Sequence, residues 1–332
     1  MEVRLSGGDD RNLMERLLEK QIPLSNSCNG KGTCGKCKVR VVSGTITDVT
    51  DTERRLLTEK EVAGHMRLAC MTKARGEVVI ETGEGEEDHV FTTGGVEGHF
   101  ERDADKHGYG LAVDIGTTTV VATLVNMDDG TEGPTYAQIN PQKTYGLDVL
   151  TRITYETEHK EAAISQLQKA IVHGLNEAAT AVCNEAGIEV TEITEIDVAA
   201  NCTMLHMLAG VDARPIGRAP YKPAFTDGQK LKARDLGLMG AAGAMVYLLP
   251  SVSAYIGADI VAGVYVCNLR HLPGKTLFID IGTNGELVLE AGGKMYSCSC
   301  AAGPALEGMN ITSGMRAAKG AVEDVHIGPD GI

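Results

Sequence analysis

Four cysteines are the first residues in this sequence whose spacing could do chemistry. Cys28, Cys34 and Cys37 lie within CNGKGTCGKC, and Cys70 follows in RLACMTK. A chain of 332 residues, 43% of them hydrophobic, is long enough to bury hydrophobic cores and does not need disulfides for its stability. The opening MEVRLSGGDD has no apolar signal segment, so we expect a cytoplasmic protein. In a reducing compartment, clustered cysteines more often bind metal or carry electrons.

The cysteine spacing favours an iron–sulfur cluster. The pattern is C-x5-C-x2-C with a distant fourth cysteine, whereas a zinc ribbon uses two close pairs. Plant-type [2Fe–2S] proteins use C-x4-C-x2-C and a distant fourth cysteine, one residue shorter in the first gap. Gly30, Gly32 and Gly35 would let the loop wrap closely and aim N–H groups at sulfur. Residues 1–83 therefore resemble a [2Fe–2S] ferredoxin domain; a zinc knuckle, or loop cysteines without a ligand, is the alternative.

Composition excludes two classes of partner. The net charge is −14 and Lys and Arg are scattered, so we expect no nucleic acid and no anionic membrane surface as partner. The most apolar stretch, residues 240–269, is interrupted by Pro250 and Asp259 and is too broken for a membrane span. We expect it to form a buried strand, AMVYLLP, and a buried helix from about Ser253.

A repeated motif comes next. DIGTTT at 114–119 and DIGTNG at 280–285 each follow one apolar run and precede another, which predicts two matching β-hairpins and an internal duplication. Asp114 and Asp280 could orient a metal-bound or nucleophilic water. The glycines allow a phosphate to approach the backbone, and the threonines offer hydroxyl and N–H donors. Ordinary hairpins with structural aspartates are the alternative.

Two such hairpins facing each other are similar to the phosphate-1 and phosphate-2 motifs of the superfamily of sugar kinases and actin. Strands alternate with helices after the first hairpin, including a helical pattern from about 147 to 186, which indicates an α/β class. The expected fold is a β-grasp ferredoxin domain followed by an actin-like ATPase of the RNase H fold with an incomplete second lobe. The predicted boundaries are 1–83 for the ferredoxin domain, 84–109 for an acidic linker, 110–273 for the first ATPase lobe and 274–332 for the start of the second.

The combination resembles the reductive activators of corrinoid proteins. YGLAVDIGTTT, NCTMLHMLAG, FIDIGTNGE and CSCAAGPALEGMNITSGMRAAKGA carry the resemblance. It implies Cys28, Cys34, Cys37 and Cys70 as ligands of a [2Fe–2S] cluster. For ATP with Mg²⁺ it implies Asp114 and Asp280 as catalytic residues, with a binding set of Gly116, Thr117, Thr118, Thr119, Gly282, Thr283, Asn284 and Gly285. Asn201 and Thr203, at the end of a strand, and Glu307 are weaker site candidates. The C-x-C spacing of Cys298 and Cys300 places both on one side of an expected strand, where they either pack or lie near the ATP or corrinoid interface; we expect packing. His206, Cys183, Cys202 and Cys267 are also expected to pack.

The function implied by the resemblance is ATP-dependent reduction of Co(II) to Co(I) in the corrinoid protein of a methyltransferase system. An upstream low-potential electron donor and pairing as a homodimer are implied as well. Family members continue past Ile332, so we expect this chain to be a fragment. The alternative is an iron–sulfur electron carrier whose actin-like part is a docking scaffold. An activator of a radical dehydratase and a small-molecule kinase explain the separate ferredoxin domain less well.

Overall fold

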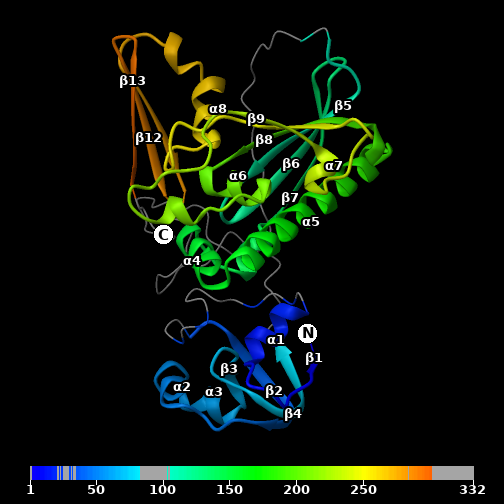
Figure 1. Cartoon of the computed structure of the whole chain (residues 1–332), viewed down its shortest axis with the longest axis vertical. Coiled ribbons are helices and arrows are strands. Elements are labelled where there is room, and N and C mark those ends of the chain that lie inside the picture. The colour runs from blue at the N-terminus through cyan, green and yellow to red at the C-terminus, as the bar shows by residue number, and fades with distance from the viewer. Residues whose placement is uncertain are drawn as a thin grey trace, which may run out of the picture. The chain divides into compact units, whose positions relative to one another are not determined.

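The computed structural model describes residues 2–20, 22, 24, 30, 32, 35–82, 103, 105–282 and 284–300. The chain divides into two compact units, residues 1–87 with 142–155 and residues 88–141 with 156–332. Both mix helices and strands, as the predicted α/β class requires (Figure 1). No helix among the described residues is long and apolar enough to cross a membrane.

The first unit is built on a four-stranded sheet in the order β1-β4-β2-β3. Alternating burial along β1 and β4 turns one face of this sheet toward α1, where Leu13 and Leu17 are fully buried. Three short helices each begin with a capping box, in which an Asn or Thr and a Glu three residues later satisfy the first N–H groups. The elements are β1 (Glu2–Leu5), α1 (Leu13–Glu19), β2 (Lys38–Ile46), α2 (Asp51–Leu56), α3 (Glu59–Ala63), β3 (Met66–Leu68) and β4 (Ala74–Thr82).

The second unit contains a six-stranded sheet in the order β7-β6-β5-β8-β10-β9, with α5 lying along one face (Figure 1). β5 and β6 form the first predicted hairpin, and β8 runs parallel to β5. The elements are β5 (Tyr109–Ile115), β6 (Thr119–Asn126), β7 (Thr131–Ile139), α5 (Glu161–Ala186), β8 (Ile193–Ala200), α6 (Cys202–Ala209), β9 (Gln229–Lys232), α7 (Ala233–Leu236) and β10 (Met245–Leu248). The helix α4 (Val149–His159) begins within residues 142–155, which group with the first unit, and ends in the second. Short 3₁₀ turns occupy Pro141–Thr144, Val190–Glu192, Arg214–Gly217 and Leu269–His271.

A separate three-stranded sheet follows α8 (Ala258–Val266), in the order β11-β12-β13. Its strands are β11 (Thr276–Ile281), β12 (Gly285–Ala291) and β13 (Lys294–Cys300), and β11 with β12 forms the second predicted hairpin. A small core of Ile256, Ile260, Leu269 and Val288 joins α8 to one face of the sheet. This packing fixes the start of α8 against the hairpin.

The helical pattern expected over 147–186 is confirmed, as two helices separated at Lys160, where φ is +54°. Two other expectations about local structure were wrong. The helix after AMVYLLP begins at Ala258 rather than near Ser253, because the Ser253 hydroxyl accepts the N–H groups of Tyr255 and Ile256 in a turn. Cys267, Cys298 and Cys300 are exposed rather than packed, whereas Cys183 and Cys202 are buried as expected.

Candidate functional site

The turn between β5 and β6 forms one wall of a cavity of about 250 Å³ in the second unit. Asp114 stands one residue before the end of β5, and Gly116, Thr117, Thr118 and Thr119 follow it around the turn. Gly116 is required by a close approach, because a Cβ at this position would lie 2.9 Å from the carbonyl oxygen of Thr119. All five of these predicted residues line the cavity.

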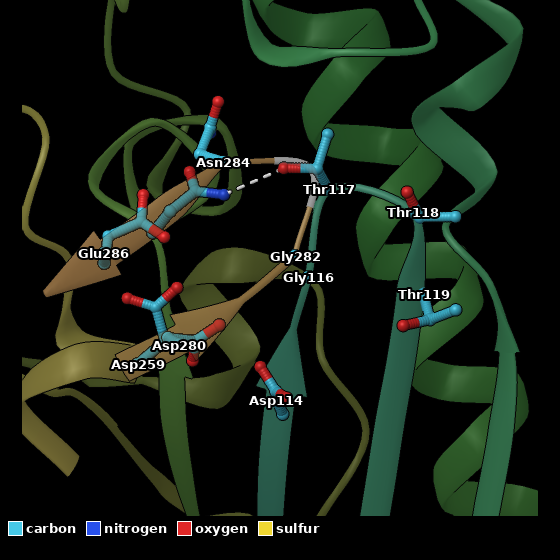
Figure 2. Close-up of a pocket in the computed structure, with 11 residues that line it drawn as sticks. Asp114, Gly116, Thr117, Thr118, Thr119, Asp259, Asp280, Gly282, Asn284 and Glu286 are labelled. Carbon is cyan, nitrogen blue, oxygen red and sulfur yellow. Dashed lines mark hydrogen bonds between the residues drawn. The ribbon is translucent and has the colours of Figure 1, made fainter. Parts of the chain in front are cut away.

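The turn between β11 and β12 forms the facing wall (Figure 2). Asp280, Gly282 and Asn284 line the cavity, and Gly282 donates its N–H to the carbonyl oxygen of Asn284 at 3.0 Å. Gly285 does not line it; this residue opens β12 and pairs with Ile281. Thr283 lies outside the described residues. The two hairpins therefore meet at one cavity, as the repeat predicted.

Two carboxylates that the sequence analysis missed complete the cavity. Asp259 lies in the first turn of α8, and Glu286 lies on β12 directly opposite Asp280. Figure 2 shows both carboxylates beside Asp280, with Asp114 nearby on β5. Glu286 could have been found from the hairpin register, because DIGTNGE with a three-residue turn places its first and last residues opposite each other. Asp259 carried no such signal, since it comes from a separate helix.

Burial and neighbouring charges raise the pKa values of the carboxylates around the cavity. Desolvation by the surrounding protein raises the pKa of Asp114 to about 6, and the charges of Asp259 and Asp280 add to this effect. Burial also raises the pKa of Asp259, Asp280 and Glu286. A cluster of acids that resist ionisation is a common mark of a binding site for a cation.

Two asparagines hold the turn after β5 in place. The Asn201 side chain donates to the hydroxyl of Thr117 at 3.1 Å, and its oxygen accepts the N–H of Met204 to cap α6. Buried Asn140, at the end of β7, donates its side-chain amide to the carbonyl oxygen of Gly116 and its backbone N–H to that of Thr118, both at 2.8 Å. Asn201 was expected as a weaker candidate, whereas no pattern in the sequence pointed to Asn140.

The neighbours of Asn201 have structural roles. Thr203 is buried in α6 and does not line the cavity. His206 is fully buried and stacks on Phe225 at a centroid distance of 4.2 Å. Its Nδ1 lies 2.8 Å from the carbonyl oxygen of Cys202, and its Nε2 accepts the N–H of Ala224 at 3.0 Å. These contacts confirm the expectation that His206 packs.

The described part of the cysteine motif fits an iron–sulfur cluster. The Cys37 and Cys70 sulfur atoms are 3.2 Å apart and both side chains are buried. The φ angles of Gly30, Gly32 and Gly35 are +77°, +69° and +66°, a conformation that favours glycine and brings backbone close to a ligand. A Cβ at Gly32 would lie 2.8 Å from the Met71 methyl group. Cys28 and Cys34 lie outside the described residues, so their role stays a prediction.

Comparison with known families gives matches in both the cysteine-containing and the hairpin-containing parts of the chain. Residues 2–75 match the 2Fe-2S iron-sulfur cluster binding domain, residues 109–272 the RACo middle region, and residues 274–332 the C-terminal domain of RACo, the ASKHA domain. The chain belongs to the RACo family. Its first domain is accordingly a [2Fe–2S] ferredoxin domain, and the following residues are an actin-like domain.

Individual members of the RACo family give the same result. The chain is 35% identical to the corrinoid activation enzyme RamQ of Eubacterium limosum, over 67% of this chain and 37% of that protein. It is 25% identical to a [Co(II) methylated amine-specific corrinoid protein] reductase of Methanosarcina barkeri, over 65% of this chain and 40% of the relative. The matches thus span about two fifths of the length of these curated relatives.

A solved member of the RACo family extends the likeness to three dimensions. The structure of a reductive activator for corrinoid, iron-sulfur protein superposes with a TM-score of 0.63 at 29% identity. The alignment covers 99% of this chain and 66% of that one. The fold predicted from the sequence is therefore confirmed.

Proposed function

We propose that this chain takes part in the ATP-dependent reduction of a corrinoid protein, returning Co(II) to Co(I) with an electron delivered through its ferredoxin domain. The observation that carries the proposal is the cavity between the β5–β6 and β11–β12 hairpins, in the same chain as the cluster-binding domain. Both named relatives act on corrinoid systems, which supports the same substrate class for this chain.

The cavity offers the groups that a polyphosphate with Mg²⁺ needs. Thr117, Thr118 and Thr119 bring hydroxyls, and the turn backbone brings N–H donors for phosphate oxygens. Asp114, Asp259, Asp280 and Glu286 supply hard oxygen ligands for a cation or its bound waters, which Mg²⁺ prefers. We assign Asp114 and Asp280 to the cation and the attacking water.

The ferredoxin domain supplies the electron path. When bound, a plant-type cluster is a one-electron carrier with a potential near roughly −400 mV. Cys37 and Cys70, with Cys28 and Cys34, would hold it and cover it with the glycine loop. Each Co(II) centre takes up one electron, so each reduction oxidises the ferredoxin domain once, and an upstream low-potential donor must reduce it again.

A free-energy argument explains why a nucleotide site would accompany an electron carrier. A potential gap of ~100–200 mV between cluster and cobalt opposes transfer by about 2–5 kcal/mol per electron. An ATPase can offset this amount if its nucleotide states bind the corrinoid protein differently. The ATPase part then changes the cobalt environment, and the ferredoxin domain delivers the electron.

The test is reduction of a Co(II) corrinoid protein by the cluster-loaded chain, followed by the appearance of the Co(I) absorption band. We expect Co(I) to form with MgATP and a low-potential reductant, and to form much more slowly without nucleotide. Asp280→Asn should keep the cluster spectrum and lose the response to ATP. A rate that is the same with and without ATP would favour the electron carrier with a docking scaffold.

A further inference from the structure

Glu53 is a fully buried carboxylate in the ferredoxin domain, and its contacts converge on the segment that carries Cys70. It is the third residue of α2 and closes the capping box with Thr50. Oε2 accepts the backbone N–H of Thr50 at 2.9 Å and its hydroxyl at 3.0 Å. The N–H of Glu53 donates in return to the Thr50 hydroxyl at 3.2 Å, which completes the capping box, yet the Glu53 carboxylate makes further bonds outside it.

The other contacts of Glu53 reach the chain on both sides of the cysteine. Oε1 accepts the backbone N–H of Leu68 at 3.1 Å and lies 3.2 Å from the hydroxyl of Thr72. That hydroxyl is also 3.0 Å from the carbonyl oxygen of Leu68. Leu68 and Thr72 flank Cys70 by two residues on each side. One carboxylate oxygen thus holds both ends of the turn from which the Cys70 sulfur projects.

Arg67 completes the contacts that hold the Glu53 carboxylate in place. It donates Nε to Oε1 and Nη2 to Oε2 of Glu53, both at 2.9 Å, in a two-point ion pair buried on both sides. Its other bonds go to the carbonyl oxygens of Thr47 at 2.7 Å and Asp48 at 3.1 Å. Burial alone would raise the pKa of Glu53, but the bonds from Arg67, Thr50 and Leu68 lower it to about 2, so the carboxylate is ionised at neutral pH.

The anchored turn is coupled to a second cysteine. The N–H of Ala69 donates to the carbonyl oxygen of Cys37 at 2.8 Å, and the Cys37 and Cys70 sulfur atoms are 3.2 Å apart. Displacement of the Leu68–Thr72 turn would therefore shift one sulfur relative to the other. In metal sites, changing a group that orients a ligand typically costs about 10–100-fold in metal affinity or activity.

We propose that Glu53 is a positioning residue for the iron–sulfur cluster, which holds the Leu68–Thr72 turn and thereby sets the place of the Cys70 sulfur. The proposal rests on the proposed function only in requiring that the domain binds the cluster, and it is independent of ATP and of the corrinoid partner. It predicts that Glu53 influences the bound cluster beyond its influence on the stability of the domain.

The test uses the full chain carrying its cluster, compared as wild type, Glu53→Gln and Thr72→Val. The readouts are the circular dichroism and electron paramagnetic resonance spectra of the cluster, its midpoint potential, and the rate of iron loss to a chelator. We expect Glu53→Gln to alter the spectra and to speed iron loss about 10–100-fold, the range found when groups that orient metal ligands are changed. Thr72→Val, which removes only the hydroxyl, should change the same readouts in the same direction by a smaller factor.

Glu61→Gln is the matched control. Glu61 closes an equivalent capping box with Thr58 at the start of α3, and it also pairs with Lys38. Among the described residues, its side chain bonds to Thr58 and Lys38 and makes no hydrogen bond with the Leu68–Thr72 turn. We expect Glu61→Gln to leave the cluster spectra and the iron-loss rate at wild-type values.

A double variant separates positioning from stability. Glu53→Met with Arg67→Met removes both charges together, and such replacements of buried ion pairs often preserve or improve stability. It leaves the N–H of Leu68 and the hydroxyl of Thr72 without their anchor, so we expect a folded domain with an altered cluster. A double variant with wild-type spectra, potential and iron-loss rate would overturn the proposal.

The proposal stays testable if Glu53→Gln fails to fold or if the wild-type chain binds no cluster. If Glu53→Gln does not fold, Thr72→Val and the double variant carry the test, and wild-type readouts in both would overturn the proposal. If the wild-type chain binds no iron–sulfur cluster at all, the proposed function and this inference fail together. A wild-type cluster with unchanged variants overturns the positioning role alone.

Discussion

The side-chain amide of Asn140 donates a hydrogen bond of 2.8 Å to the carbonyl oxygen of Gly116. Asn140 follows β7, the strand that pairs with β6 on the side away from β5. Its backbone N–H reaches the same turn at Thr118. The loop that would face the phosphates is therefore held from outside by a residue that does not line the cavity.

Asn140→Ala should weaken ATP binding by about 5–30-fold, because losing a buried hydrogen bond costs roughly 1–2 kcal/mol and frees the turn to move. Titration calorimetry with MgATP measures the effect. The matched control is Asn176→Ala, which loses two hydrogen bonds, to Gly237 and Met239, away from the cavity. Equal weakening in both variants would contradict a specific role for Asn140.

Asp114→Asn should stabilise the nucleotide-free protein at pH 7.5 while abolishing ATP turnover. The pKa of Asp114 is raised from 3.8 to about 6, first by desolvation and then by the charges of Asp259 and Asp280. Between these values the native state holds a proton that the unfolded state releases, so stability falls as the pH rises through this window.

Asp114→Asn removes the free-energy cost of ionising this carboxyl in the folded protein. Because the carboxyl faces the solvent in the cavity, we expect a gain of about 1 kcal/mol rather than the full value of the shift. Urea denaturation at pH 7.5 and at pH 4 measures the difference between variant and wild type. A gain of the same size at both pH values would show that the charge of Asp114 is not its cause.

Cys37→Ser or Cys70→Ser should strip the iron–sulfur cluster from the chain, because each sulfur is a predicted ligand in a buried position. Iron and sulfide content and the visible spectrum report the loss. Cys267→Ser is the control, since Cys267 is exposed and lies beyond the end of α8. Zinc in place of iron in the wild-type chain would refute the assignment.

His206→Gln should reduce the loss of stability on acidification below about pH 6.5. Burial lowers the pKa of His206, so below its unfolded value of 6.5 the unfolded state takes up a proton that the native state refuses, and stability falls. The loss of the buried contacts should also destabilise the protein by roughly 1–3 kcal/mol at pH 7.5. A steeper pH dependence of stability in His206→Gln than in the wild type would argue against this account.

The predictable part of the site was the part that is contiguous in sequence. The motifs DIGTTT and DIGTNG predict their turns because Asp, Gly and Thr have distinct backbone and hydrogen-bonding roles. Asn140 and Asp259 were not predicted, because no local sequence pattern links their elements to the motifs. Asn140 contacts the turn at Gly116 from the end of β7, and Asp259 lines the cavity from α8. Cys28, Cys34 and Thr283 lie outside the described residues and remain predictions.

Side-chain hydrogen bonds and missing neighbours explain the errors in the fold. Ser253 satisfies two backbone N–H groups and so delays the start of α8, which hydrophobicity alone could not indicate. Cys298 and Cys300 share one face of β13, as predicted from their spacing. Their burial was mispredicted because apolar character does not reveal which face of a sheet is covered; within the described residues this face is open.

The raised pKa values around the cavity have a consequence for what enters it. Burial and the neighbouring charges make Asp114, Asp259, Asp280 and Glu286 harder to ionise than they would be in water. A cation in the cavity would favour the ionised form of these carboxyls, and metal binding to such ligands releases any protons that they hold. Cation loading of this site should therefore weaken as the pH falls, because protons and the cation compete for the same oxygen atoms.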